Sequence, residues 1–149
     1  MQQFYPLVVS DITPLTPNAV DISFEIPESL KEVFAFESGQ YITVKHSIDG
    51  TEIRRAYSLS SKPGENKLTI GVKKVPDGTF SVYANETLKK GDVLEVMPPQ
   101  GRFLFAADGE TRDILEFAAG SGITPIMSIV QTALDINTEN RVVLVYGNK

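Results

Sequence analysis

The stretch EIRRAYSLS, residues 52–60, predicts a β-strand that carries two adjacent arginines. A period of two divides its side chains between two faces, with Ile53, Arg55, Tyr57 and Leu59 on one and Arg54, Ala56 and Ser58 on the other. Arg55 and Tyr57 therefore share a face. A guanidinium fork suits a phosphate, and a tyrosine ring can lie against an aromatic cofactor. The alternative is a solvent-exposed strand with ordinary arginine–carboxylate pairs.

Five further segments carry strand signals, and turn residues such as Asp49-Gly50 and Asp77-Gly78 separate them. These segments are residues 4–12, 20–26, 40–48, 67–75 and 92–97. Six short strands at this spacing predict an antiparallel barrel or sandwich. One helix interrupts them. Its apolar stripe is Phe80, Tyr83, Ala84, Thr87 and Leu88.

The character of the chain changes after the acidic segment AADGE, residues 106–110. DILEFAAG (113–120) is an apolar strand, and RVVLVYG (141–147) has the continuous apolar character of a parallel strand covered on both faces. Between them, one helical stripe is formed by Ile126, Ile129, Val130, Ala133 and Leu134. The pattern predicts a β–α–β nucleotide-binding unit. We therefore expect two units, residues 1–107 and 108–149.

Two segments can approach a phosphate. Gly78, Thr79, Phe80 and Ser81 open the first helix, where free amides and the helix dipole favour an anion. Capping by Thr79 or Ser81 is the alternative interpretation.

The second phosphate candidate is AAGSGITPI, residues 118–126, which lies between a strand and a helix like a dinucleotide loop. Gly120 and Gly122 permit a tight turn, with Ser121 between them. Thr124 is the expected N-cap, and Pro125 is expected at the first helical position.

Composition narrows the classes of partner and site. Nineteen acidic and 14 basic side chains give a net charge of −5, which argues against nucleic acid or an anionic membrane as partner. No secretory signal or apolar span is evident, so we expect a cytoplasmic protein. The chain has no cysteine, and the acidic stretch 108–113 predicts a solvated linker, so we expect no metal site. The one histidine, His46, is interpreted as structural or exposed.

Taken in order, the motifs RRAYSLSS, GVKKVPDGTFS, PPQGRF, AAGSGITPI and VYGN resemble the ferredoxin–NADP reductase superfamily. Within it, the sequence is most similar to the reductase components of phenylacetyl-CoA epoxidase and related oxygenases. The resemblance implies a mainly β fold: a six-stranded antiparallel Greek-key barrel that binds FAD in residues 1–107. It implies that residues 108–149 are the first, incomplete part of an NAD(P)-binding domain, so we expect the chain to be truncated there.

The resemblance also implies roles for individual residues. It implies that Arg55 binds the FAD phosphate, that Tyr57 contacts the flavin region and that Ser58 lies near flavin N5; Ala56 belongs to the same cofactor-binding strand. Tyr57 and Ser58 are thus the expected catalytic residues. The remaining expected cofactor contacts are Val72 and Lys73 beside the flavin, Gly78, Thr79, Phe80 and Ser81 at the pyrophosphate, and Gly120, Ser121, Gly122, Thr124 and Pro125 at the nicotinamide nucleotide.

The activity that follows from the resemblance is hydride transfer from NAD(P)H to FAD and release of single electrons to an iron–sulfur protein or oxygenase component. A [2Fe–2S] cluster is expected only in a missing C-terminal domain. Two alternatives stay open: a ferredoxin- or flavodoxin-NADP reductase without an iron–sulfur domain, and a non-catalytic binding module. The open edge and apolar faces of residues 113–146 predict a homodimer through the incomplete α/β unit.

Overall fold

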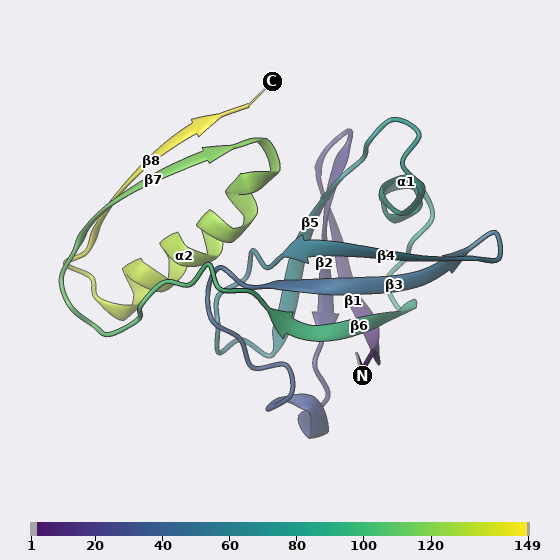
Figure 1. The fold of residues 1–149 in the computed structure, drawn as a ribbon, viewed down its shortest axis with the longest axis horizontal. Coiled ribbons are helices and arrows are strands. Elements are labelled where there is room, and N and C mark those ends of the chain that lie inside the picture. The colour runs from purple at the N-terminus through teal and green to yellow at the C-terminus, as the bar shows by residue number, and fades with distance from the viewer. Residues whose placement is uncertain (1–2, 149) are drawn as a thin grey trace.

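The computed structural model describes residues 3–148, which form a barrel and a smaller β–α–β unit beside it (Figure 1). Met1, Gln2 and Lys149, at the ends of the two predicted units, lie outside the described residues. The strands are β1 (Tyr5–Thr16), β2 (Ala19–Glu25), β3 (Tyr41–Ile48), β4 (Thr51–Ser58), β5 (Lys67–Lys73), β6 (Val93–Gln100), β7 (Asp113–Ala119) and β8 (Arg141–Gly147). The α-helices are α1 (Thr79–Glu86) and α2 (Ile123–Ile136), and short 3₁₀ helices span Glu28–Leu30 and Gly120–Gly122.

The barrel is a six-stranded antiparallel sheet in the order β4-β3-β6-β1-β2-β5. A single bridge between Leu59 and Ile70, extended by the hydrogen bond from Ser60 N to Thr69 O, brings the two outer strands together. Strands β3, β4 and β5 are then consecutive neighbours, and β6 returns beside β3, which is a Greek key. The predicted fold class is confirmed.

Strand β1 forms the corner between the two halves of the barrel. Its first residues, 5–8, pair with β6, whereas residues 9–16 pair with β2. The register shifts between Val9 and Asp11, as expected where a bulge bends a strand from one partner to another.

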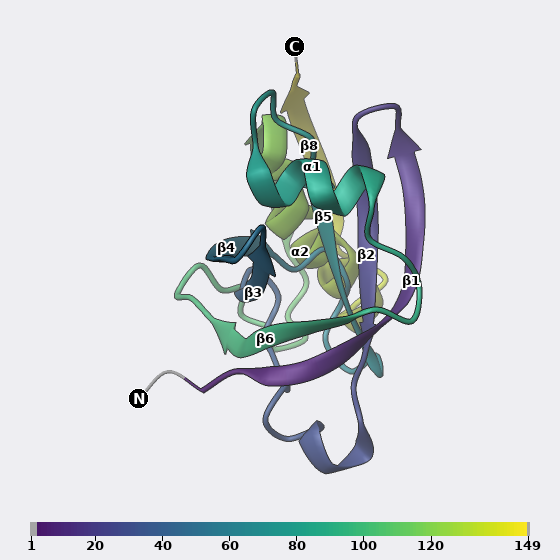
Figure 2. The same ribbon diagram turned by 90° about the vertical axis from the view of Figure 1, so that its right-hand side faces the viewer.

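Strand alternation and one helix build the core. The inward residues of all six strands are buried, including Leu7, Ile22, Phe24, Ile42, Val44, Leu68, Ile70 and Val96. Helix α1 lies across one end of the barrel (Figure 2) and buries Phe80 and Ala84, and Leu88, just after the helix, is buried beside them. Thr87, expected in this stripe, is exposed because the helix ends at Glu86 and Thr87 is its C-cap.

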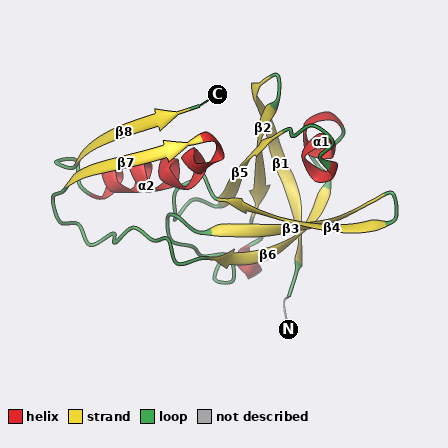
Figure 3. Cartoon of the chain, turned by 45° about the horizontal axis from the view of Figure 1, so that its top comes forward, coloured by secondary structure: helices red, strands yellow, loops and turns green. Residues whose placement is uncertain are grey.

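In the second unit, β7 and β8 pair in parallel, with Asp113 opposite Arg141. Helix α2 covers one side of this sheet only (Figure 3). The other side of the sheet is uncovered, in agreement with the open apolar faces expected for residues 113–146: Val143 and Val145 are 59% and 49% exposed. Leu134, expected in the buried stripe of α2, is 43% exposed, whereas Ser128 is fully buried.

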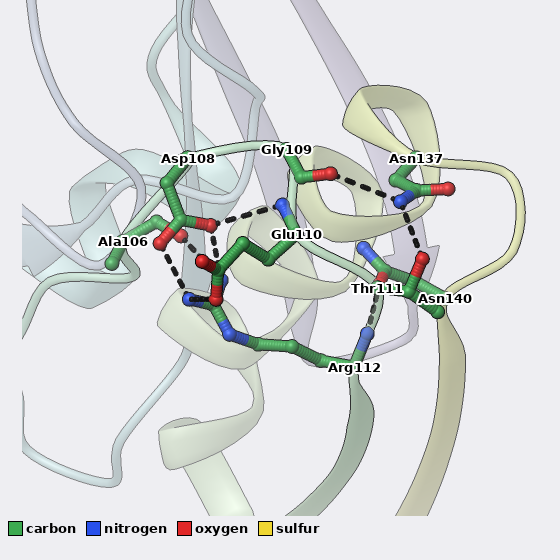
Figure 4. A network of polar contacts seen from close by, with 8 residues as sticks. All are labelled: Ala106, Asp108, Gly109, Glu110, Thr111, Arg112, Asn137 and Asn140. Carbon is green, nitrogen blue, oxygen red and sulfur yellow. Dashed lines mark hydrogen bonds and ion pairs between the residues drawn. The ribbon is translucent and has the colours of Figure 1, made fainter.

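The linker between the units is held by a network of polar contacts around Arg112, Asn137 and Asn140 (Figure 4). Arg112 donates to Asp108 Oδ1 at 2.6 Å and to the Ala106 carbonyl at 3.0 Å. The Arg112 guanidinium lowers the pKa of Asp108. The acidic residues thus neutralise an arginine, and no group of metal-ligating side chains occurs in residues 3–148. None of the helices in this range is long and apolar enough to cross a membrane.

Candidate functional site

The two neighbouring arginines of β4 have different environments. Arg54 donates from Nε to Glu52 at 2.8 Å, and its guanidinium lies 5.2 Å from the centre of the Phe4 ring. Arg55 donates only to the carbonyl of Arg54, at 2.8 Å, and pairs with no carboxylate within residues 3–148. The alternative interpretation, an ordinary arginine–carboxylate pair, therefore applies to Arg54. Arg55 is the arginine that is available to an anion.

Tyr57 is half-buried on the same face of β4 as Arg55. Its ring centre lies 5.8 Å from that of Phe80, which comes from the first turn of α1. Burial raises the pKa of the Tyr57 hydroxyl above its ordinary value, and the nearby Arg55 guanidinium opposes that rise. The hydroxyl is therefore protonated at neutral pH. On the other face, Ala56 is exposed and Ser58, opposite Tyr41 of β3, is half-buried.

Helix α1 begins without a side-chain cap. Its N-cap is Gly78, and Thr79 is exposed. The Ser81 hydroxyl instead accepts a hydrogen bond from the Val75 amide at 3.2 Å. Capping by Thr79 or Ser81 is thus not what the structure shows. A Cβ on Gly78 would lie 2.3 Å from Ser81 Oγ, so the turn requires glycine.

A cleft of about 760 Å³ separates β5 and the β1–β2 hairpin from the start of α2. Val72 and Lys73 lie on its barrel side, and Gly120, Ser121 and Thr124 lie on its other side. The side chain of Val72 is buried in the core, so Lys73 and Gly71 form this part of the wall. The two walls approach each other closely at this point, since a Cβ atom added to Gly71 would lie 3.6 Å from Thr124 Cγ2.

The glycine loop opens into this cleft through a 3₁₀ turn that continues directly into α2. Gly120 has a φ of +53°, and Cβ atoms on Gly120 or Gly122 would meet nothing within 4 Å. The prediction of Thr124 as N-cap and Pro125 as first helical residue is wrong. The N-cap is Gly122, and α2 starts at Ile123 because the 3₁₀ turn already sets the helical path. The Thr124 hydroxyl donates to the Ser121 carbonyl at 2.7 Å.

Further residues of the cleft wall were not predicted from the sequence. The cleft is also lined by Asp21, Ser60, Ser61, Thr69 and Tyr146. Burial raises the pKa of the Asp21 carboxyl. The alternation of side chains along β2 places Asp21 on the outer face of this strand. Asp21 reaches the cleft only because β2 pairs with β5, which sets Asp21 opposite Gly71.

The predicted residues thus form two groups. Arg55 and Tyr57 meet the Gly78–Ser81 turn through the Tyr57–Phe80 contact. Lys73 faces the Gly120–Thr124 loop across the cleft, whereas the side chain of Val72 points into the core. Residues 59–61, which follow β4 and pair with β5, connect the two groups. The site can therefore accept an extended ligand with a phosphate at one end and a second nucleotide at the glycine loop.

Comparison with known protein families identifies the class of protein that has this arrangement. The oxidoreductase FAD-binding domain family matches residues 6–105, and the oxidoreductase NAD-binding domain family matches residues 117–149. The chain belongs to the oxidoreductase FAD-binding domain family, and its last residues match the NAD-binding domain family that follows.

Among individual relatives, the chain is 42% identical over 152 residues to one of the subunits of 1,2-phenylacetyl-CoA epoxidase from Escherichia coli (strain K12). The match covers all of this chain and 42% of the relative, so the chain spans less than half the relative's length.

Two solved structures share the fold. A ferredoxin NADP+ reductase from Neisseria gonorrhoeae with bound FAD and NADP superposes with a TM-score of 0.80 at 23% identity, over 98% of this chain and 58% of that one. Phthalate dioxygenase reductase superposes with a TM-score of 0.76 at 25% identity, over 98% and 44%.

Proposed function

We propose that this chain is the FAD-binding part, with the start of the nicotinamide-binding part, of an NAD(P)H-dependent reductase. The observation that carries the proposal is the placement of Arg55. This arginine has no carboxylate partner within residues 3–148 and shares the face of Tyr57, whose ring lies near the uncapped start of α1. A free guanidinium and an uncapped helix start beside an aromatic ring fit the phosphates and flat ring of FAD.

The assignment of residues follows this geometry. Arg55 and the Gly78–Ser81 turn would hold the pyrophosphate, while Tyr57, Ser58 and the adjoining Ala56 backbone would border the flavin. Val72 and Lys73 would approach it from β5. The nicotinamide nucleotide would lie against the loop from Gly120 to Pro125, with its open glycines. We place the FAD-binding domain at residues 1–107 and the nicotinamide-binding portion at 108–149.

The chemistry supplied by a bound FAD would be uptake of a hydride equivalent from NAD(P)H and release of single electrons. Such transfer depends on contact and alignment rather than on a strong acid or base. The chain's residues therefore act by holding two flat ligands in register. The Tyr57 hydroxyl stays protonated and neutral because burial raises its pKa, and Ser58 offers a hydroxyl on the neighbouring face.

The electron acceptor we propose is an iron–sulfur centre of an oxygenase system. The support is the similarity to a component of phenylacetyl-CoA epoxidase and to a reductase described as transferring electrons from pyridine nucleotides to [2Fe–2S]. Phenylacetyl-CoA as the final substrate of the system, and a cytoplasmic location, stay predictions.

A visible absorption spectrum after reconstitution with FAD and desalting tests the proposed cofactor. We expect retained flavin bands and an FAD dissociation constant raised at least tenfold by Arg55→Ala, since one charge-assisted phosphate contact is lost. Arg54→Ala is the matched control and should leave the constant within about twofold. Equal effects of the two variants, or a colourless wild-type protein, would contradict the proposed site.

We also propose that the 149-residue chain self-associates through the side of the β7–β8 sheet opposite α2. Leu115, Phe117, Val143 and Val145 are 58%, 69%, 59% and 49% exposed. Both strands also present a free edge to a second copy, which supports a twofold dimer. Light scattering should give the mass of a dimer for the parent chain. Phe117→Lys should lower it to the mass of a monomer. Leu134→Lys, a control on α2, should leave the dimer intact. A monomer at all concentrations would refute it.

A further inference from the structure

We propose that Ser128 is a positioning residue that fixes the glycine loop against the flavin-binding strand. The proposal rests on the function proposed above, because it concerns how far the FAD site and the nicotinamide nucleotide site lie from each other. Ser128 lies in the second turn of α2 and is fully buried. Its hydroxyl donates a 2.6 Å hydrogen bond to the carbonyl of Ser61 in the barrel.

Ser61 lies at the closure of the barrel. Its own hydroxyl accepts a hydrogen bond from the Thr69 amide of β5 at 3.1 Å, next to the bond from Ser60 N to Thr69 O. Ser61 is therefore held by β5 on one side and by α2 on the other. A shift of α2 would therefore have to break a bond to the segment that closes the barrel.

The position of Ser128 indicates a specific purpose for its hydroxyl. A buried hydroxyl is costly unless it is bonded, and an apolar residue would be expected at a buried helix position. Here the hydroxyl satisfies the carbonyl of a residue that is itself only 6% exposed. Met127 and Gln131 line the cleft, whereas Thr132 and Asp135 line a second cavity, so the Ser128 contact lies between the two.

Both ends of this bond are close to the proposed chemistry. Ser61 follows Ser58 by three residues, and Ser128 follows Thr124 by one helical turn. Helix α2 connects Thr124 to Ser128, and the short segment from Ser58 to Ser61 is held to β5 by the Leu59–Ile70 bridge and the Ser60–Thr69 hydrogen bond, so a displacement at the bond is passed to the cleft. Because hydride transfer is sensitive to misplacement of about 1 Å, at up to roughly 100-fold in rate, this contact can set the rate without touching a ligand.

One other side-chain polar contact joins α2 to the barrel within residues 3–148, the ion pair of Lys62 with Asp135. Both side chains are at least one-third exposed, and exposed ion pairs contribute little. Asp135→Asn is therefore the matched control: it removes an inter-unit contact on the same helix and leaves the buried bond intact.

The first experiment measures position without any cofactor. The chain has no cysteine, so Glu25→Cys on β2 and Thr138→Cys after α2, both exposed, give two unique sites for spin labels. In the monomeric Phe117→Lys background we expect one narrow distance distribution, a broadened distribution on adding Ser128→Ala and no change on adding Asp135→Asn. A distribution that Ser128→Ala leaves narrow would overturn the proposal whether or not FAD binds.

The second experiment uses the full-length FAD-loaded protein and separates alignment from binding. We expect Ser128→Ala to slow flavin reduction by NAD(P)H by about tenfold or more, with the FAD dissociation constant and cofactor absorbance unchanged. An unchanged reduction rate would overturn the proposal. A parent protein that binds no flavin would instead contradict the proposed function, and the label distances would still decide the role of Ser128.

The pair Ser128→Thr and Ser128→Val provides the decisive comparison if Ser128→Ala folds poorly. Threonine and valine have the same shape, and only threonine keeps the hydroxyl. We expect the threonine variant to retain the narrow distance distribution and most of the reduction rate, and the valine variant to lose both. Equal behaviour of the two variants would overturn the proposal.

Discussion

At the scale of single residues, Asp21 is a carboxylate that folding partly removes from water. It lies on the cleft wall, where an added Cβ on Gly71 would be 3.5 Å from its Oδ1. Burial raises its pKa above the ordinary value of 3.8. The folded state therefore binds the proton more tightly than the unfolded chain, so stability falls as the pH rises above the unfolded value of 3.8 and the full loss is reached above the raised folded-state pKa.

We expect Asp21→Asn to stabilise the chain at pH 7 by a few tenths of a kcal/mol, a small effect because the group is only half-buried. The gain should shrink as the pH falls and should vanish below about pH 3.8, where Asp21 is protonated in both states. Thermal unfolding at about pH 3 and pH 7 measures it. A variant less stable than wild type at pH 7 would show that the carboxylate has a stabilising partner.

The sequence predicts such residues only in part. Alternation places Arg55 and Tyr57 on one face, but it cannot show that Glu52 neutralises Arg54 and leaves Arg55 unpaired, because that depends on side-chain reach. Asp21 was missed because its surroundings come from a strand, β5, that lies about 50 residues later in the sequence. Residue roles that depend on long-range pairing are the least accessible to sequence reasoning.

At the scale of elements, the two helices start at glycines with opposite surroundings. A Cβ on Gly78 would lie 2.3 Å from Ser81 Oγ and 2.9 Å from the Val75 carbonyl oxygen. A Cβ on Gly122 would meet nothing within 4 Å, and its φ of −63° suits any residue. The first glycine is required by the fold, whereas the second leaves space beside the cleft.

These surroundings predict opposite results for two alanine substitutions. Gly78→Ala should destabilise the chain by about 1–3 kcal/mol, since the turn must shift. Gly122→Ala should leave stability unchanged or slightly raised, yet weaken nicotinamide nucleotide binding if the open space is where the ligand approaches. Chemical denaturation and ligand titration of both variants separate the two effects. A destabilised Gly122→Ala would contradict this distinction.

Elements were predictable where a period of two or 3.6 extends over several residues. The six barrel strands and both helices were found in this way. Their ends were less accessible: β6 continues to Gln100 through Pro98 and Pro99, beyond the alternating residues, because its last residue pairs with Tyr41 of β3. The start of α2 was displaced by a 3₁₀ turn, whose glycines carry no helical periodicity.

At the scale of the whole molecule, the main hydrophobic core lies entirely within the barrel. Its buried members run from Leu7 to Val96, and none comes from β7, α2 or β8. Within the described part of the second unit, the buried apolar residues are Ile126, Ile129 and Ala133, all on α2. Stability should therefore come mainly from the first unit.

We accordingly expect residues 1–107 to fold alone, with one cooperative thermal transition and a melting temperature within about 10 °C of the whole chain. Residues 108–149 alone should show no cooperative transition. Circular dichroism of the two fragments tests this expectation. A non-cooperative 1–107 fragment would mean that contacts such as Ser61–Ser128 are needed to close the barrel.

The corner strand β1 has a consequence for how the chain acquires its structure on the ribosome. The first residues of β1 pair with β6, so Tyr5 has no partner until Val96 has been synthesised. At a synthesis rate of about 5–20 residues per second, that wait is roughly 5–18 s. Such remote pairing also slows spontaneous folding, because the entropy of closing a long loop is lost first. Residues 5–8 of the nascent chain are therefore unpaired for seconds, and such an exposed strand segment is prone to aggregation until β6 emerges.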